Sequence, residues 1–223
     1  SWGVAVALAD LDNDMDLDAY IAATGPVENR PNLLFENING QMLPVAGAGG
    51  AEGTLDGRAD AVALADYDND GFIDIATVNG RSKSPFDLDG PIQLFRNTGN
   101  QNNWLEIDLE GIKSNRDGLG AIVVAKTGGI TQTRTQDSGI LFKGQNDSRL
   151  HFGLAQYSRV DSLQINWPSG TVQNIERVPA NHIMRIVEES RPSVHGAPAY
   201  NPGVESGIFI WKDHIDGPYQ LVV

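Results

Sequence analysis

The chain of 223 residues contains no cysteine, and this absence removes several kinds of chemistry at once. Disulfide bonds, zinc–thiolate sites and thiol nucleophiles are all excluded. Aromatic residues make up only 7% of the chain, and no apolar run approaches the roughly 18 residues of a membrane-spanning helix. The chain also begins directly in a strand-like run rather than in a signal peptide. We therefore expect no membrane span and a processed N-terminus.

Positive charge is scarce in the first half of the chain. Residues 1–100 hold 16 Asp and Glu against 5 Lys and Arg, whereas residues 101–223 hold 13 against 11, and the net charge is −13. Proteins that bind nucleic acids rely on Lys and Arg to neutralise phosphates. We therefore expect no nucleic-acid partner, and the acidic first half favours bound cations instead.

Helical periodicity is missing from residues 1–100, whereas alternation of apolar and polar residues recurs along the whole chain. Gly (25) and Pro (11) are as frequent as in proteins of many short strands joined by turns. Leu105, Ile107 and Leu109 alternate with acidic residues, and residues 163–167 lead into a hairpin turn at 168–170. The sequence therefore predicts an all-β protein.

An internal repeat organises the first half. Residues 5–14 read AVALADLDND and residues 61–70 read AVALADYDND, which is identity at nine of ten positions. Residues 32–37 and 92–97 are also similar. Each stretch contains Leu-Phe-x-Asn, with one variable residue between Phe and Asn. Repeats of this kind indicate similar structural units that share a core. We expect each copy to be a small antiparallel unit of three to four strands.

The loop at residues 66–74 has the form D-x-D-x-D-G-x-x-D, which suits a metal ion. Carboxylates at alternate positions of a tight loop converge, and Gly71 permits the sharp turn because positive φ costs glycine little. All-oxygen ligation with several carboxylates favours Ca²⁺ over Mg²⁺, and zinc would prefer His or Cys. The predicted ligands are Asp66, Asp68, Asp70, the carbonyl of Phe72, and Asp74.

The loop at residues 10–18 repeats the pattern, with Met15 at the glycine position. A left-handed conformation there would cost methionine on the order of 1 kcal/mol, so we expect this second Ca²⁺ site to be the weaker of the two. The predicted residues are Asp10, Asp12, Asp14 and Asp18, with Asp16 contributing through its charge.

Two other interpretations fit the loops less well. Asp and Asn favour solvated turns without any ion, but two copies with matched flanks make that interpretation the poorer one. An EF-hand loop has 12 residues, ends in Glu and lies between helices, whereas these loops have an Asp at the ninth position and lie between predicted strands.

Residues 1–101 resemble tandem FG-GAP/VCBS repeats, and residues 102–189 resemble the ASPIC/UnbV domain. The second resemblance is carried by NWL at 103–105, SNRDGLGA at 114–121, QNDSRLHFGL at 145–154, VDSL at 160–163, WPSG at 167–170 and VPAN at 178–181. The resemblance implies two propeller-blade-like repeats followed by a β-sandwich or barrel-like domain. It also implies a secreted or surface-attached, calcium-binding protein that is not an enzyme. A propeller needs roughly four to eight blades, so two repeats cannot close one alone.

Residues 190–203 are predicted to be a linker, and the apolar stretches at 207–211 and 219–223 a β-hairpin tail. Unpaired sheet edges and an apolar tail suggest self-assembly into a ring or filament through strand exchange. We therefore hypothesise an extracellular calcium-binding structural or adhesion protein whose partners are itself, an extracellular protein or a glycan. The alternatives are a lectin-like or protein-binding module and, more remotely, a glycan hydrolase that uses paired Asp.

Overall fold

A computed structural model of the chain describes residues 2–25, 30–80, 90–137, 141, 143–189, 209–212 and 220–222. Within these residues every regular element is a β-strand except one short 3-10 turn, which confirms the predicted all-β fold. The chain divides into two compact units, residues 1–100 with 139–147 and residues 101–138 with 148–223. Over the same described residues, we find no helix with the length and apolar character that a membrane crossing requires.

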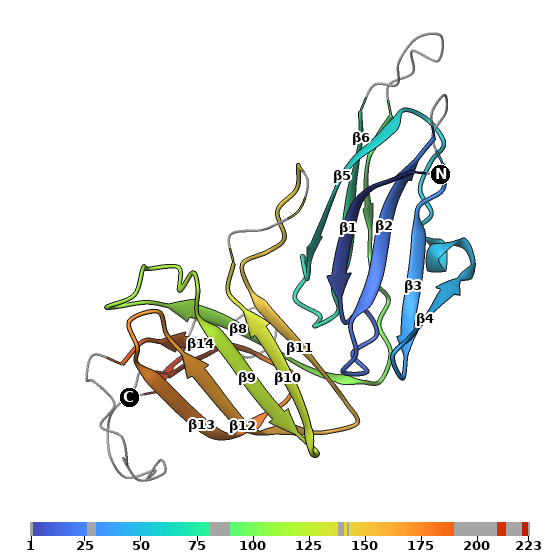
Figure 1. Cartoon of the computed structure of the whole chain (residues 1–223). Helices are drawn as coiled ribbons and strands as arrows, with labels where there is room; N and C mark the ends of the chain where they lie inside the picture. The colour runs from blue at the N-terminus through green and yellow to red at the C-terminus, as the bar shows by residue number, and fades with distance from the viewer. Residues whose placement is uncertain are drawn as a thin grey trace. The chain divides into compact units, whose positions relative to one another are not determined.

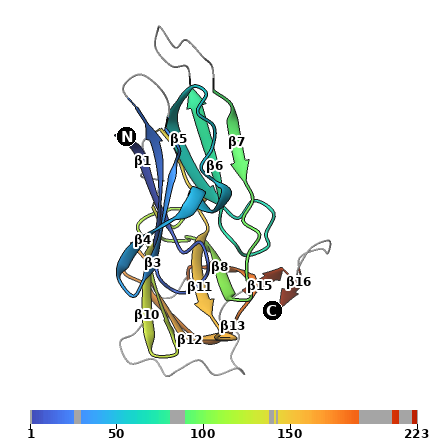
Figure 2. The same ribbon diagram turned by 90° about the vertical axis from the view of Figure 1, so that its right-hand side faces the viewer.

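The first unit begins with a four-stranded antiparallel sheet in the order β1-β2-β3-β4 (Figure 1). Its strands are β1 (Trp2–Ala9), β2 (Asp18–Thr24), β3 (Leu33–Ile38) and β4 (Gln41–Val45), and the 3-10 turn Ala46–Gly50 follows. The second sheet runs in the order β5-β6-β7 (Figure 2). Its strands are β5 (Arg58–Ala65), β6 (Asp74–Gly80) and β7 (Ile92–Phe95). The sequence repeat is therefore a structural repeat, with the three to four strands expected.

The two repeats share one core. Ala5, Ala7 and Tyr20, on one face of the first sheet, lie in the same buried cluster as Val62 and Leu64 of the second sheet. Small alanine side chains thus face larger aliphatic ones across the interface. Because side chains alternate along a strand, each sheet buries one face in this cluster and turns its other face away.

The outward face of the first sheet carries apolar side chains. Val6 and Leu8 are 49% and 54% exposed, whereas their repeat equivalents Val62 and Leu64 are 1% and 4% exposed. The difference arises because the alanine face of the first sheet covers Val62 and Leu64, while no described element covers the equivalent face of the first sheet.

The outer edge of β5 is covered by residues 143–147, which come much later in the sequence. Leu64 N donates to Asn146 Oδ1 at 2.9 Å, and Asp147 N donates to Leu64 O at 2.9 Å. Lys143 Nζ lies 3.1 Å from Asp60 Oδ1 in an ion pair. This stretch lies inside the part of the sequence that resembles ASPIC/UnbV, yet it is packed in the first unit. It occupies a strand edge that would otherwise be open to pairing.

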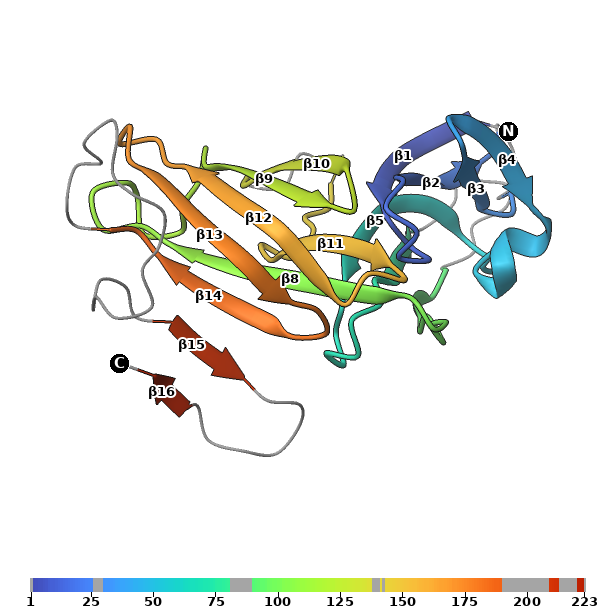
Figure 3. The ribbon, with the colours of Figure 1, turned by 90° about the horizontal axis from the view of Figure 1, so that it is seen from below.

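The second unit is a sandwich of two sheets, in the orders β10-β9-β12-β13 and β11-β8-β14-β15-β16 (Figure 3). Its first seven strands are β8 (Asn103–Glu110), β9 (Ile122–Thr127), β10 (Ile130–Thr135), β11 (Leu150–Ala155), β12 (Arg159–Asn166), β13 (Val172–Pro179) and β14 (Ile183–Val187). One cluster of buried side chains fills the space between the sheets, including Leu105, Phe152, Leu163, Trp167 and Met184.

The predicted hairpin tail is present as β15 (Phe209–Lys212) and β16 (Gln220–Val222). β15 pairs antiparallel with β14 of the same chain, so the tail extends its own sheet in this structure (Figure 3). The predicted linker at 190–203 lies outside the described residues.

A buried carboxylate ties the end of β14 to two loops of the sandwich. Glu188 is 1% exposed, and its Oε2 accepts hydrogen bonds from the backbone N–H groups of Ile112, Lys113 and Ser114 at 2.8, 2.7 and 2.7 Å. Its Oε1 accepts from the Ser114 and Ser169 hydroxyls. Burial alone would raise the pKa of Glu188, but these hydrogen bonds lower the pKa to about 2.

We predict that Glu188→Gln destabilises the chain by about 1–3 kcal/mol at pH 7, because an amide leaves some of these donors without an acceptor. Since the folded pKa lies below the unfolded value, the stabilisation is complete above about pH 4.5 and disappears as the pH falls toward 2. Urea unfolding of the wild-type chain and of Glu188→Gln should show a large difference at pH 7 and a much smaller one at pH 2.5. The exposed Glu176→Gln serves as the control, and an equal loss in both variants would contradict the role of Glu188.

Candidate metal centre

Each acidic loop joins the first two strands of its sheet, and the two loops have the same backbone conformation. In the first loop Asn13 and Met15 have φ of 61° and 87°, and in the second Asn69 and Gly71 have φ of 57° and 88°. The expected left-handed turn is therefore present in both loops, and Met15 adopts it although it is not glycine.

The first aspartate of each loop fixes this conformation by accepting backbone hydrogen bonds. Asp10 accepts from the N–H groups of Asp14 and Met15 at 3.0 and 2.9 Å. Asp66 accepts from those of Asp70 and Gly71 at 3.1 and 2.7 Å. A repeated sequence thus produces a repeated hydrogen-bond pattern, which a solvated turn does not require.

The last aspartate of each loop is the first residue of the following strand, and backbone hydrogen bonds fix it in the same way. Asp18 accepts from Leu11 N at 2.9 Å and from Asn37 N at 2.9 Å. Its equivalent Asp74 accepts from Tyr67 N at 3.1 Å and Asn97 N at 2.7 Å. Each carboxylate oxygen has a second lone pair, so these bonds leave capacity for a cation.

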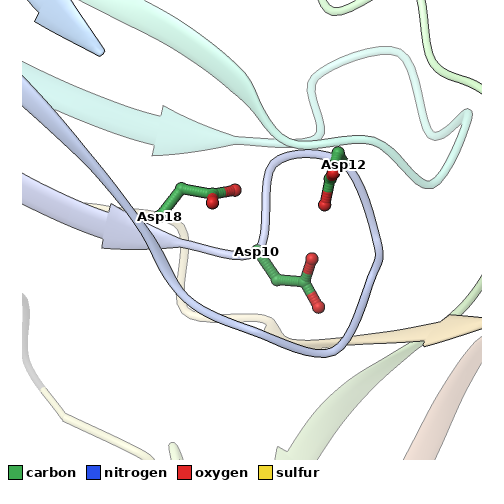
Figure 4. A group of neighbouring side chains, drawn as sticks. All are labelled: Asp10, Asp12 and Asp18. Atoms are coloured by element: carbon green, nitrogen blue, oxygen red, sulfur yellow. The ribbon is translucent and has the colours of Figure 1, made fainter. Parts of the chain in front are cut away.

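Three carboxylates converge in each loop. Asp10, Asp12 and Asp18 each offer an oxygen within 4.8 Å of the other two, and Figure 4 shows the three side chains directed into the loop. Asp66, Asp68 and Asp74 form the equivalent group.

The remaining predicted ligands lie outside these two groups. Asp14 Oδ1 accepts from Asp16 N at 2.8 Å, and Asp70 Oδ1 accepts from Phe72 N at 3.0 Å. The fifth position of each loop therefore closes the turn through its own side chain. Phe72, whose carbonyl is the other predicted ligand, lies in the second loop with its side chain buried.

Burial and mutual repulsion disfavour the charged form of the converging groups. The pKa of Asp12 rises to about 6, mainly through burial and then through the charges of Asp14 and Asp18. Burial also raises the pKa of Asp66 to about 6, although backbone hydrogen bonds oppose the shift. The same causes raise the pKa of Asp18 and Asp74. A bound cation would reverse this balance, because an adjacent positive charge favours the ionised carboxylate.

The donor set fits a hard divalent cation. Asp68 Oδ1 is buried without a hydrogen-bond partner in the described residues, and so is Oδ1 of the fully buried Asn13. Buried polar atoms in native proteins almost always have a partner, so these oxygens leave room for a ligand at the loops. Carboxylate oxygens with no nearby His or Cys suit Ca²⁺ better than zinc.

Asparagine side chains connect the two loops, a role that the sequence analysis does not predict. Asn13 Nδ2 donates to Gly71 O at 3.0 Å, and Asn97 Nδ2 donates to Leu11 O at 2.7 Å. Asn100 Nδ2 donates to the carbonyl of Asp12 at 2.6 Å. The Asn that follows Leu-Phe in both repeats was the available signal, because its backbone N–H holds the last aspartate of each loop.

The loops differ in the charge beside them. Arg96 Nε lies 2.6 Å from Asp68 Oδ2, and Arg96 Nη2 lies 3.1 Å from Asp70 Oδ2. The equivalent position in the first repeat is Glu36, whose negative charge adds a smaller contribution, after burial, to the raised pKa of Asp12 and Asp18.

A pocket of about 600 Å³ opens beside the first loop, within the first unit. Asp12, Asp18 and Glu36 line its polar part together with Arg96. Its apolar part is lined by Leu11, Leu34, Val45, Ile73, Ile75, Leu94 and Phe95, among other residues. The first loop is therefore accessible from a cavity large enough for a small ligand.

Comparison with known proteins gives a family match over much of the second half of the chain. Residues 111–193 match the family described as ASPIC and UnbV, as predicted. The resemblance of residues 1–101 to FG-GAP/VCBS repeats stays a prediction.

The relatives are cartilage acidic proteins. The chain is 30% identical over 173 residues to cartilage acidic protein 1 of Xenopus tropicalis, covering 75% of this chain and 26% of that protein. It is 28% identical over 190 residues to cartilage acidic protein 1 of Homo sapiens, covering 82% of this chain and 28% of that protein. The chain thus spans about a quarter of the length of these curated relatives.

Proposed function

We propose that this chain is a calcium-binding structural module that works outside the cell and is not an enzyme. The observation that supports the proposal is the duplicated loop, in which three carboxylates converge with the same hydrogen bonds in both copies. A cation in each loop would relieve carboxylate repulsion and stabilise the connection between two strands. Metal binding and local folding would then be coupled.

The extracellular location is supported by the expected affinity and by the relatives. Oxygen-ligand calcium sites of extracellular modules have dissociation constants of about 10⁻⁴–10⁻³ M, which leaves them largely empty at cytosolic calcium concentrations. The relatives are named for cartilage, a tissue rich in extracellular matrix. The non-enzymatic assignment is supported by the aspartates themselves, because the groups that could act as acid and base are committed to the loops.

We expect calcium to raise the melting temperature of the metal-free chain. At 10 mM calcium and dissociation constants of 0.1–1 mM, each site would add about 1–3 kcal/mol to the free energy of unfolding. Differential scanning calorimetry with calcium and with a chelator measures this effect. The double variant Asp10→Asn/Asp66→Asn should lose the response, whereas the exposed Asp117→Asn should keep it. Identical melting in calcium and chelator would refute the proposal.

We further propose that the module associates with a second copy of itself through its open sheet faces. The tail strand pairs within its own chain, so strand exchange is not the route that the structure favours. The alanine face of the first sheet already packs on Val62 and Leu64 of the second sheet. The first sheet repeats the latter face with Val6 and Leu8 exposed. The second sheet repeats the alanine face, where Ala61 is 6% exposed and Val78, paired with it on β6, is 40% exposed. The same pair of faces could therefore meet between copies, in a head-to-tail contact.

This association predicts a mass above 24.0 kDa that increases with protein concentration in sedimentation equilibrium. Leu8→Lys should return the protein to monomer, because a lysine in the contact would lose its hydration. Ile130→Lys, at a site 47% exposed in the second unit, is the matched control and should leave association unchanged. A wild-type protein that stays monomeric in millimolar calcium would rule out this contact.

The pocket beside the first loop favours a second candidate function, a lectin-like module. A cation held by Asp12 and Asp18 would keep coordination positions open toward the pocket, and sugar hydroxyls could occupy them. A glycan array probed in calcium and again in chelator tests this candidate. Calcium-dependent binding that Asp18→Asn removes would support the lectin-like candidate. An array without signal would contradict it, and the structural role would then be the remaining proposal.

A further inference from the structure

The two loops share a backbone, a hydrogen-bond pattern and a carboxylate set, so their difference lies in their surroundings. Position 36 of the first repeat corresponds to position 96 of the second, since residues 32–37 align with residues 92–97. The first carries Glu36 and the second Arg96. This exchange reverses the charge at one equivalent position of the two repeats.

Arg96 neutralises the second loop from within the chain. Its guanidinium contacts Asp68, one of the three converging carboxylates, and also Asp70. A cation at the second loop would have to displace Arg96 from Asp68 or bind beside a fixed positive charge. Either event weakens binding directly.

Glu36 has the opposite effect on the first loop. Its charge adds to those of Asp12 and Asp18, and all three side chains line the same pocket as Arg96, whose guanidinium is paired with Asp68 and Asp70 of the second loop. Crowded negative charge is unfavourable without a cation and attractive to one. The first loop should therefore gain more from binding than the second.

Met15 bears on this order through the conformation of its loop. Its φ of 87° matches the φ of 88° at Gly71, so the turn has the same geometry in both loops. A left-handed methionine costs stability of the fold. Met15 alone predicts that the first loop is the weaker site, whereas the charges at positions 36 and 96 favour the opposite order.

We infer that Arg96 is a built-in counter-ion of the second loop, and that the loop beside Glu36 is the tighter cation site of the pair. This inference rests on the proposed calcium binding. Replacing a negative by a positive neighbour should weaken divalent-cation binding about tenfold at a partly solvated site. The chain should consequently fill the Asp10, Asp12 and Asp18 site first.

The affinities can be assigned with one variant for each loop. Isothermal titration of calcium into Asp74→Asn reports on the first loop, and titration into Asp18→Asn reports on the second. We expect binding to Asp74→Asn to be about tenfold tighter than binding to Asp18→Asn. Adding Arg96→Glu to Asp18→Asn should tighten the second loop about tenfold, and adding Glu36→Arg to Asp74→Asn should weaken the first by a similar factor.

A measurement without calcium tests the role of Arg96 independently. Arg96→Gln should lower the melting temperature of the metal-free protein because the carboxylates lose their counter-ion, whereas Glu36→Gln should raise it because repulsion falls. Arg159→Gln removes an equally exposed arginine beside Asp161 in the second unit and serves as the control. Circular dichroism shows that each variant is folded before it is titrated.

The outcomes separate this inference from the proposed function. No calcium binding by the wild-type chain would overturn both. Binding with equal affinity at the two loops, or affinity at the second loop that Arg96→Glu leaves unchanged, would overturn the inference while the calcium-binding function stands.

Discussion

The first unit depends on carboxylates that are held close together against their own repulsion. Asp10 and Asp66 each accept two backbone N–H groups, and Asp18 and Asp74 each accept two more from either side of the loop. The backbone therefore forces the acidic side chains to converge, because the turn that brings the strands together is made from their hydrogen bonds. The loop cannot keep its conformation and also spread its charges.

The core of this unit explains why such loops are useful. Among the residues whose burial is described, the first sheet contributes mainly alanines to the shared cluster, together with the large and fully buried Tyr20. Small side chains remove little apolar surface from water, so the contact between the two sheets is weakly stabilised by burial alone. Polar connections supplement it: Asn13 and Asn97 join the loops, and the segment that carries Asn146 covers the edge of β5.

Local features of this structure could be predicted from the sequence, whereas long-range ones could not. The alternation of residues 103–110, the hairpin at 168–170 and the turn at Met15 all depend on neighbours in the chain, and all three are present. The contact of Asn146 with Leu64 joins residues 82 positions apart. The pairing of Arg96 with Asp68 likewise depends on the loop beside which the chain lies at the end of β7. Nothing in the spacing of the aspartates indicates that one loop would meet a cation of its own chain.

The two units hold buried carboxylates in opposite ways, and the contrast distinguishes a structural group from a binding group. Glu188 has hydrogen-bond donors for both oxygens, and the donors lower its pKa to about 2. Asp12 is half-buried and Asp66 is buried, both among other acids, and their pKa rises to about 6. A carboxylate that the protein has fully satisfied needs nothing further to remain charged. Carboxylates that the fold brings together ionise less readily than isolated ones, and a bound cation would favour their charged form. If cations bind as proposed, the first loop, where Glu36 adds negative charge, would gain more from one than the second, where Arg96 already pairs with Asp68.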